Sequence, residues 1–361
     1  MREIIELTKE LIRFKTMHSK PEEIQRCASH IENYLKNNDI PYRRMDHNQI
    51  PSILVMPPND YASILLMSHI DVVDAPDEMF EPIEKDGKLF GRGSIDDKYA
   101  AALSLVLIKN QLQRLKDTNG GQEDLAFGIL ITGDEEIGGA DGVQIALKEI
   151  KTDFAIALDG GSIEKIVVKE KGIVQLKLIA RGKSAHGARP WLGENAIENL
   201  IDDYMILKKY FDLSTPDHWH RTLNFGRIQA GESINQVPDY AEALFDVRYT
   251  ENDDMEDVVE QIRDKIRGEL IVEKKEPLFM GGETPYLDLL LEISPKTAVG
   301  FEHGASDARF LSDHGFKGIV WGADGDMSQH SADEHLNIDS VDELYRVLDE
   351  FMERSMDLKK V

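Results

Sequence analysis

Three consecutive carboxylates, Asp134, Glu135 and Glu136, follow an apolar run over residues 125–131, and glycines come soon after them. Such a run bounded by glycine is typical of a buried strand in a parallel sheet. Carboxylates at the end of that strand must be solvated, paired or bound to a metal, because an uncompensated buried charge is costly. Open α/β sheets bind ligands at this strand end. The stretch is a candidate site, with a solvated acidic turn as the alternative.

Two other predicted strands also end in polar residues. The apolar stretch 63–67 leads into His69-Ile-Asp71, and the stretch 154–158 ends at Asp159. Side chains alternate along an extended chain, so His69 and Asp71 lie on the same side. A carboxylate beside a His can fix the ring tautomer that metal binding needs. A buried, hydrogen-bonded His at a strand end would show the same pattern.

Further candidate ligands stand outside the strands. Asp96 follows a Gly-Arg-Gly turn and precedes an apolar helix-forming stretch, 99–108. Taken alone, Asp96 would cap that helix, and the turn lacks the spacing of a phosphate-binding loop. His330 and His335 lie between the last predicted strand and the last predicted helix. Imidazoles and carboxylates from separate strand ends can form a site for two metal ions.

The order of the predicted strands and helices that position these residues changes along the chain. Strands and helices alternate up to residue 172 and again from 284, which predicts an α/β domain with a mixed, mostly parallel sheet flanked by helices. The intervening order of strands and helices, β-α-β-β-α, predicts an inserted α+β sandwich. The first predicted domain therefore consists of residues 1–172 and 284–361, and the inserted domain consists of residues 173–283. Within the insertion we expect a strand at 174–180, a helix at 194–211, strands at 221–230 and 241–249, and a helix at 254–267.

The composition of the chain disfavours several classes of binding partner. The chain has 361 residues and a formal charge of −25, which disfavours nucleic acid and anionic membranes. One cysteine, Cys27, excludes an intrachain disulfide and a cysteine metal cluster. No apolar run approaches the ~20 residues of a membrane span, and no signal peptide is recognised. We expect a cytoplasmic protein with no membrane partner.

The motifs resemble, in order, those of the M20 metallopeptidases, a family that includes carboxypeptidases, succinyl-diaminopimelate desuccinylase and di- and tripeptidases of the peptidase T type. Each motif is weak alone, but five in order around the same insertion are specific. The resemblance extends over essentially the whole chain. Its motifs are Ser68–Val73, Gly91–Lys98, Thr132–Gly138, Gly182–Ala196 and Gly231–Arg248.

The resemblance implies two metal ions per chain. Oxygen and imidazole ligands suit Zn²⁺, with Mn²⁺ or Co²⁺ as alternatives. Two such ions lower the pKa of a shared water and polarise the scissile carbonyl. Carried over by position, His69 binds one ion and is oriented by Asp71, Asp96 bridges both ions, Glu136 and His330 complete one site, and Asp159 completes the other.

The resemblance also assigns residues that bind no metal. Glu135 is the expected general base, which takes a proton from the water and passes it to the leaving amine. His186 is expected to stabilise the oxyanion, in its own site or in that of a partner subunit. Arg248, with Asn235, is expected to hold a substrate carboxylate, which suits the planar guanidinium. A surface ion pair is the alternative for Arg248. In the family, the inserted domain forms a lid and a homodimer interface.

Three positions depart from the family pattern. Tyr99 replaces a common Gly, and Asp97 adds a charge that is either solvent-facing or paired with Lys98. Asp159 resembles the di- and tripeptidases, because the deacylases and carboxypeptidases usually carry Glu there. The sequence therefore predicts a hydrolase of short peptides, of di- or tripeptidase or aminopeptidase type. The alternatives are an N-acyl-amino-acid deacylase or desuccinylase, and a metal-binding homologue without activity, which the intact Glu135–Glu136 pair disfavours.

Overall fold

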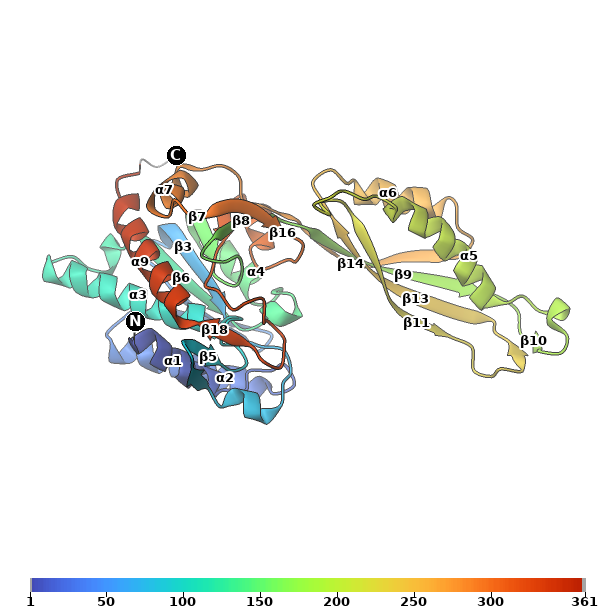
Figure 1. Ribbon diagram of the computed structural model, residues 1–361, viewed down its shortest axis with the longest axis horizontal. Coiled ribbons are helices and arrows are strands. Elements are labelled where there is room, and N and C mark those ends of the chain that lie inside the picture. Colours follow the sequence, from blue (N-terminus) through green and yellow to red (C-terminus); the bar gives the residue numbers. More distant parts are fainter. Residues whose placement is uncertain (1, 359–361) are drawn as a thin grey trace. The chain divides into compact units, whose positions relative to one another are not determined.

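The chain folds into two compact units, each described here by itself (Figure 1). The computed structural model describes residues 2–358, so Met1 and 359–361, the outermost residues of the predicted domains, lie outside the described residues. Unit 1 contains the chain up to 169, residues 279–302 and the chain from 306 onward, and unit 2 contains residues 170–278 and 303–305. The assignment of a catalytic and a lid role to the predicted segments stays a prediction.

Unit 1 is built on a mixed sheet, which confirms the predicted α/β fold. In the described part of the chain the sheet has nine strands, in the order β1-β2-β6-β3-β7-β17-β8-β15, with β16 beside β8. The central strands β6, β3, β7 and β17 are parallel. The strands are β1 (Arg43–His47), β2 (Ile50–Val55), β3 (Tyr61–His69), β6 (Phe127–Thr132), β7 (Lys151–Ala157), β8 (Lys165–Glu170), β15 (Phe279–Met280), β16 (Ala298–Glu302) and β17 (Lys317–Val320).

The position of β3 creates a crevice at its carboxyl end. After β3 the chain forms β6 on one side of it, and it then forms β7 on the other side. Open sheets bind ligands where the strand order reverses in this way, because the connections at that strand end diverge. The crevice lies beyond His69, Thr132 and Ala157, the last residues of the three strands.

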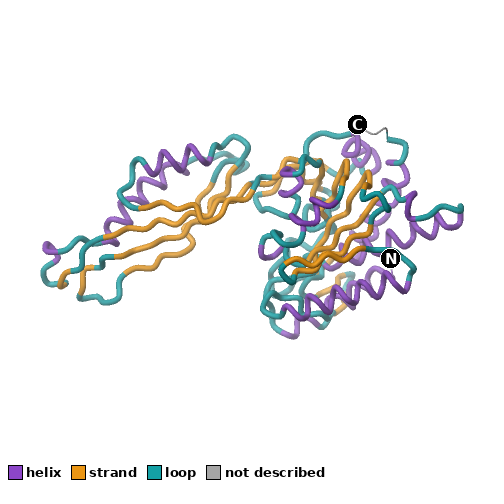
Figure 2. Tube along the Cα trace, turned by 180° about the vertical axis from the view of Figure 1, so that it is seen from behind, coloured by secondary structure: helices purple, strands orange, loops and turns teal. Residues whose placement is uncertain are grey.

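Helices cover both faces of this sheet (Figures 1 and 2). Alternation in β3 directs Ile64 and Leu66 into one buried cluster with α1, α2, α3, α7 and α9, and it directs Leu65 and Met67 into a second cluster with α4 and α8. None of the described helices is both long and apolar enough to cross a membrane. The helices are α1 (Arg2–Ile12), α2 (Pro21–Asn37), α3 (Lys98–Asp117), α4 (Val143–Ala146), α7 (Pro285–Ile293), α8 (Arg309–Asp313) and α9 (Ile338–Ser355).

Some local elements differ from the sequence pattern. The stretch 141–149, for which the sequence predicts a single helix, is divided into α4 and a 3-10 turn at Leu147–Glu149. Just before α4, the Asp134 carboxylate accepts the backbone N–H groups of Asp141 and Gly142. A small separate sheet consists of β4 (Ile83–Lys85), β5 (Lys88–Phe90) and β18 (His335–Asn337), and other 3-10 turns lie at Asp77–Phe80, Gln122–Asp124, Glu135–Ile137, Pro190–Leu192 and Lys209–Phe211.

Unit 2 is a two-layer α+β element. Its antiparallel sheet has the order β11-β13-β9-β14, and buried side chains of β9 and β13 pack against α5 and α6. The sequence pattern missed β14, because this edge strand reads ELIVEKKE and edge strands tolerate exposed charges. A separate pair, β10 and β12, carries His186. The bounds are β9 (Gly172–Arg181), β10 (Ala185–His186), α5 (Ala196–Lys208), β11 (Thr222–Ala230), β12 (Gln236–Val237), β13 (Tyr240–Tyr249), α6 (Met255–Arg263) and β14 (Glu269–Glu276).

Phe154→Ala should reduce the free energy of unfolding of unit 1 by about 3–5 kcal/mol, because it leaves a cavity in a packed core. Phe154 is fully buried, and its ring centroid lies 5.3 Å from that of Tyr286. Urea unfolding followed by circular dichroism measures the loss. Ile83→Ala, at an exposed position of β4, is the control and should change stability by at most about 0.5 kcal/mol. Equal effects of the two substitutions would contradict the central place of Phe154 in this core.

Candidate active site

Asp96 lies between two imidazoles. Its Oδ1 is 3.0 Å from His69 Nε2, and its Oδ2 is 3.0 Å from His330 Nε2. His330 Nε2 is also 3.3 Å from Glu136 Oε2. Among the described residues, Asp96, Glu136 and His330 offer ligand atoms that all lie within 4.8 Å of one another. A carboxylate that turns each oxygen to a different imidazole has the arrangement that a bridging ligand needs.

The contacts of His69 favour the tautomer that binds metal. Its Nδ1 lies 3.1 Å from the backbone carbonyl oxygen of Asp71, which can only accept a hydrogen bond. Nδ1 therefore carries a proton. Nε2 faces the Asp96 carboxylate, which also accepts a hydrogen bond. Burial opposes the charged ring, but the carboxylates of Asp71 and Asp96 raise the pKa of His69. Loss of the Nε2 proton would leave Nε2 as the atom that can bind a metal. The Asp71 carboxylate is farther from the ring, with 3.4 Å between Oδ1 and Nδ1. Residue 71 thus holds the ring mainly through its backbone.

The buried Asp71 carboxylate instead orders the acidic turn. It accepts the backbone N–H groups of Glu135, at 3.2 Å, and of Glu136, at 3.0 Å. His18 Nε2 contacts the same carboxylate at 3.0 Å. Burial opposes ionisation, but the contacts with His18 and His69 lower the pKa of Asp71 to about 2. Sequence reasoning missed His18, because a lone His in a loop 53 residues away carries no motif.

The three consecutive carboxylates have three different environments. Asp134 is buried and holds the turn before α4. Glu136 Oε1 accepts the N–H of Val73 at 3.2 Å, so its other oxygen faces His330. Glu135 Oε1 lies 3.7 Å from Nη1 of the buried Arg309. Burial raises the pKa of Glu135 well above the ordinary carboxyl range, and nearby carboxylates add to this shift.

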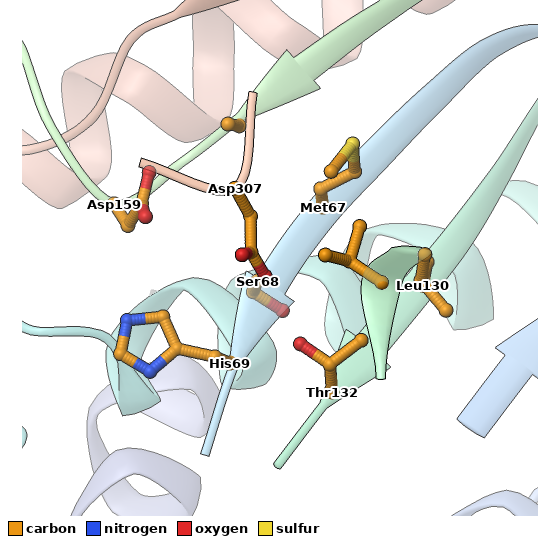
Figure 3. Close-up of a pocket in the computed structure, with 9 residues that line it drawn as sticks. Met67, Ser68, His69, Leu130, Thr132, Asp159 and Asp307 are labelled. Atoms are coloured by element: carbon orange, nitrogen blue, oxygen red, sulfur yellow. The ribbon is translucent and has the colours of Figure 1, made fainter. Parts of the chain in front are cut away.

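Asp159 faces a second part of the crevice. It lines a small cavity with His69, Ser68 and Asp307 (Figure 3). Tyr99 supports this strand end, since its hydroxyl donates to the Leu158 carbonyl at 2.6 Å. Burial raises the pKa of Asp159 to about 6 and that of Asp307 to about 8. Asp307, which also lines this cavity, was not predicted as a site residue.

Asp97 is a correction to the sequence interpretation. It is fully buried, and its Oδ2 accepts the backbone N–H of His69 at 3.3 Å. Lys98 does not pair with it but donates from Nζ to the Phe14 carbonyl at 2.7 Å. Burial raises the pKa of Asp97 well above its ordinary value. The chain therefore places another carboxyl group against the strand that bears a predicted ligand.

The donor set fits divalent cations. Buried oxygens of four carboxyl groups, Asp97 Oδ1, Asp134 Oδ1, Asp159 Oδ1 and Asp307 Oδ1, have no hydrogen-bond partner. Like charges this close cannot all ionise without a cation, and bound cations restore their charged form. The structure brings His69, Asp96, Glu136 and His330 into direct contact, whereas Asp159 shares only the cavity with His69. The role of each residue stays a prediction.

His335 stands apart from this group. Its Nδ1 contacts the Asp333 carbonyl at 2.8 Å, and its Nε2 contacts Asp326 Oδ2 at 3.0 Å. Nε2 also lies 2.9 Å from Lys88 Nζ of β5, so both ring nitrogens of His335 are engaged away from Asp96 and Glu136.

The other predicted residues belong to unit 2. Exposed His186 accepts the Ala188 N–H on Nδ1 at 3.1 Å, so its neutral ring carries the proton on Nε2. The carbonyl of Asn235 accepts the N–H of Gly187 at 2.7 Å, which ties the two motifs together. Arg248 Nε donates to Asp246 Oδ1 at 2.7 Å, which is the ion pair of the alternative interpretation.

Comparisons with known proteins agree with this architecture. Residues 168–273 match the M20 peptidase dimerisation domain. The chain is 26% identical to a probable carboxypeptidase of Aspergillus clavatus, over 80% of this chain and 74% of that protein. It is 25% identical to the succinyl-diaminopimelate desuccinylase of a Wolbachia pipientis strain, over 96% of this chain and 92% of that protein.

Solved structures share the fold over the whole length. A tripeptidase from Staphylococcus aureus superposes with a TM-score of 0.78 at 20% identity, covering 98% of both chains. A dinuclear metal-binding peptidase of the M20 family from Bacillus subtilis gives a TM-score of 0.64 at 14% identity, covering 97% of both. These findings confirm the resemblance inferred from the sequence motifs.

Zinc should stabilise the protein more at pH 8 than at pH 5. Unfolded carboxyl groups titrate near pH 4, below the folded pKa values of about 6 for Asp159 and about 8 for Asp307. Between these limits the zinc-free folded state holds protons that the unfolded state has lost, so its stability falls as pH rises. Bound cations favour the charged carboxylates and offset that loss.

Urea unfolding at both pH values, with a chelator and with zinc, measures this difference. Asp307→Asn is the matched variant and should flatten part of the zinc-free pH dependence. An equal gain from zinc at pH 5 and pH 8 would contradict the assignment of these carboxyl groups to a cation site.

Proposed function

We propose that this chain, an M20-type metallopeptidase in sequence and fold, binds two zinc ions and hydrolyses the amide bonds of short peptides, as a di- or tripeptidase or an aminopeptidase. The observation that carries the proposal is the position of Asp96, whose two oxygens each face a different His. Two ions held by His69, Asp96, Glu136, Asp159 and His330 would activate water and polarise the scissile carbonyl.

Glu135 is the proposed general base. It lies beside the ligand Glu136, and the Asp71 carboxylate fixes the backbone of both residues. Burial raises the pKa of Glu135, and Arg309, 3.7 Å from its Oε1, opposes that shift. Bound cations would further favour the ionised carboxylate that a base requires. Glu135 takes the proton of the attacking water and delivers it to the nitrogen of the leaving amine. The crevice around it is lined by buried strand ends, so bulk water is limited there.

Two residues of unit 2 complete the proposal. The Ala188 contact leaves the proton of His186 on Nε2, and that N–H can donate to a developing oxyanion. Arg248 is proposed to bind the substrate α-carboxylate with Asn235. The guanidinium donates from Nε and Nη2 to the Asp246 carboxylate, so a substrate carboxylate would have to take the place of Asp246 or share the guanidinium with it.

The substrate class rests on Asp159, which resembles the corresponding residue of di- and tripeptidases. An N-acyl-amino-acid deacylase is the second candidate, favoured by the similarity to a desuccinylase. The match to a dimerisation domain supports a homodimer formed through unit 2. The single cysteine, Cys27, is buried, which is compatible with the proposed reducing cytoplasm. The negative charge disfavours nucleic acid as a partner.

Metal content and hydrolysis should be measured on the same preparation, purified without chelator. We expect about two zinc ions per chain by elemental analysis, in line with a two-metal mechanism, and chelation should abolish hydrolysis of dipeptides and tripeptides. Acetyl- and succinyl-amino acids, run in parallel, separate the two candidates. Glu135→Gln should retain both ions and lose turnover. Loss of metal in that variant would mean that Glu135 and Glu136 have exchanged roles, and a chain without metal or activity would leave only the fold.

Arg248→Ala should raise KM for peptides with a free α-carboxylate about tenfold or more, because a charged hydrogen-bond partner contributes about 1.5–3 kcal/mol. The same peptides with an amidated terminus should be unaffected. Arg227→Ala is the control, since Arg227 is an exposed arginine on the neighbouring strand β11 and belongs to no motif. Equal effects on carboxylate and amide substrates would make Arg248 a surface ion pair.

A further inference from the structure

The two loops that carry Asp96 and His330 extend from the same end of one strand pair. Strands β5 and β18 are antiparallel, with Phe90 opposite His335. The loop with Asp96 leaves β5 directly after Phe90, and the loop with His330 enters β18 directly before His335. Neither loop has strand or helix hydrogen bonds across the segment that carries its predicted ligand. Their separation must therefore be set by other contacts.

Glu334 supplies these contacts. It is the last residue before β18, it is 1% exposed, and neither the motifs nor the proposed reaction assigns it a role. Its Oε1 accepts the backbone N–H of Gly93 at 2.9 Å and, at 3.4 Å each, those of Ile95 and Asp96. Its own carbonyl accepts the N–H of Gly91 at 3.1 Å. One residue of the His330 loop thus holds four backbone groups of the Asp96 loop.

Arg92, in the Asp96 loop, makes further contacts with the His330 loop. Its guanidinium, 4% exposed, pairs with Glu334 Oε2 and donates to the Ser331 carbonyl at 3.3 Å. A buried ion pair is stable only while both members remain, because either one alone is an uncompensated charge. Arg92, which belongs to the Asp96 loop, therefore contacts the turn just after His330. Glu334, which belongs to the His330 loop, contacts Asp96 and the residues just before it.

We propose that Glu334 is a positioning residue that fixes the distance between the Asp96 and His330 ligand atoms and thereby sets the zinc affinity of the site they share. This inference rests on the proposed function for the identity and number of the ions and for the ligand roles of Asp96 and His330. Side chains that orient metal ligands typically change affinity about 10–100-fold when they are removed. Glu334 acts on two ligands at once, and it does so through the backbone of one of them.

The test measures zinc affinity by competition with a chromophoric chelator, together with the melting temperature of the zinc-free protein. Glu334→Ala should weaken one of the two zinc sites at least tenfold and leave the other within about threefold, since a single orienting contact accounts for about 10–100-fold. Glu334→Gln keeps an oxygen acceptor for the three N–H groups and loses only the charge opposite Arg92. The zinc affinity of Glu334→Gln should therefore lie between that of Glu334→Ala and that of the wild type. Glu334→Gln also serves as the test if Glu334→Ala does not fold.

Asp203→Ala is the matched control. Asp203 is likewise a 1% exposed carboxylate, and it accepts the backbone N–H groups of Arg267 at 3.0 Å and Gly268 at 2.8 Å, within unit 2. Its removal should lower the melting temperature without changing zinc affinity. Zinc affinities of both Glu334 variants equal to the wild type, or an equal loss in Asp203→Ala, would overturn the positioning role. A wild-type chain that binds no zinc would instead overturn the proposed function, so the two failures are distinguishable.

Discussion

A buried carboxylate is stable only where donors or cations surround it, and the strand ends of unit 1 gather more carboxylates than nearby donors satisfy. Asp71 and Asp134 are surrounded by backbone N–H groups and define the shape of the loops. Asp97, Asp134, Asp159 and Asp307 each keep a buried oxygen without a partner. Backbone N–H groups therefore satisfy only part of this set of carboxylates, and the crevice keeps a deficit of positive charge.

The topology explains why residues so distant in the sequence share this deficit. Because β3 has β6 on one side and β7 on the other, three neighbouring parallel strands of the main sheet deliver their ends to one place. The candidate ligand His330 reaches the same place through the loop before β18, which pairs with β5 rather than with the main sheet. The metal-ligand candidates thus come from two sheets.

Much of this arrangement could be predicted from the sequence, because strand ends leave a pattern. Apolar runs that stop at His69, at the acidic turn and at Asp159 marked the crevice. A single side chain that contacts a residue far away in the sequence leaves no such pattern. His18 contacts the carboxylate of a residue 53 positions away, and Glu334 contacts Asp96, which is 238 positions away. The charged edge strand β14 was not predicted for a related reason, because it is stabilised by pairing with β9 and not by a pattern in its own residues.

The ends of the inserted segment lie close together in unit 1. The chain leaves after β8 and returns at β15, and the N–H of Gly281 donates to the carbonyl of Val168 at 2.8 Å. Domain insertion is tolerated where the two ends of the inserted piece are adjacent, because the host sheet closes without it. Unit 2 is in this sense an insertion whose length and sequence can vary without breaking the pairing of the sheet in unit 1.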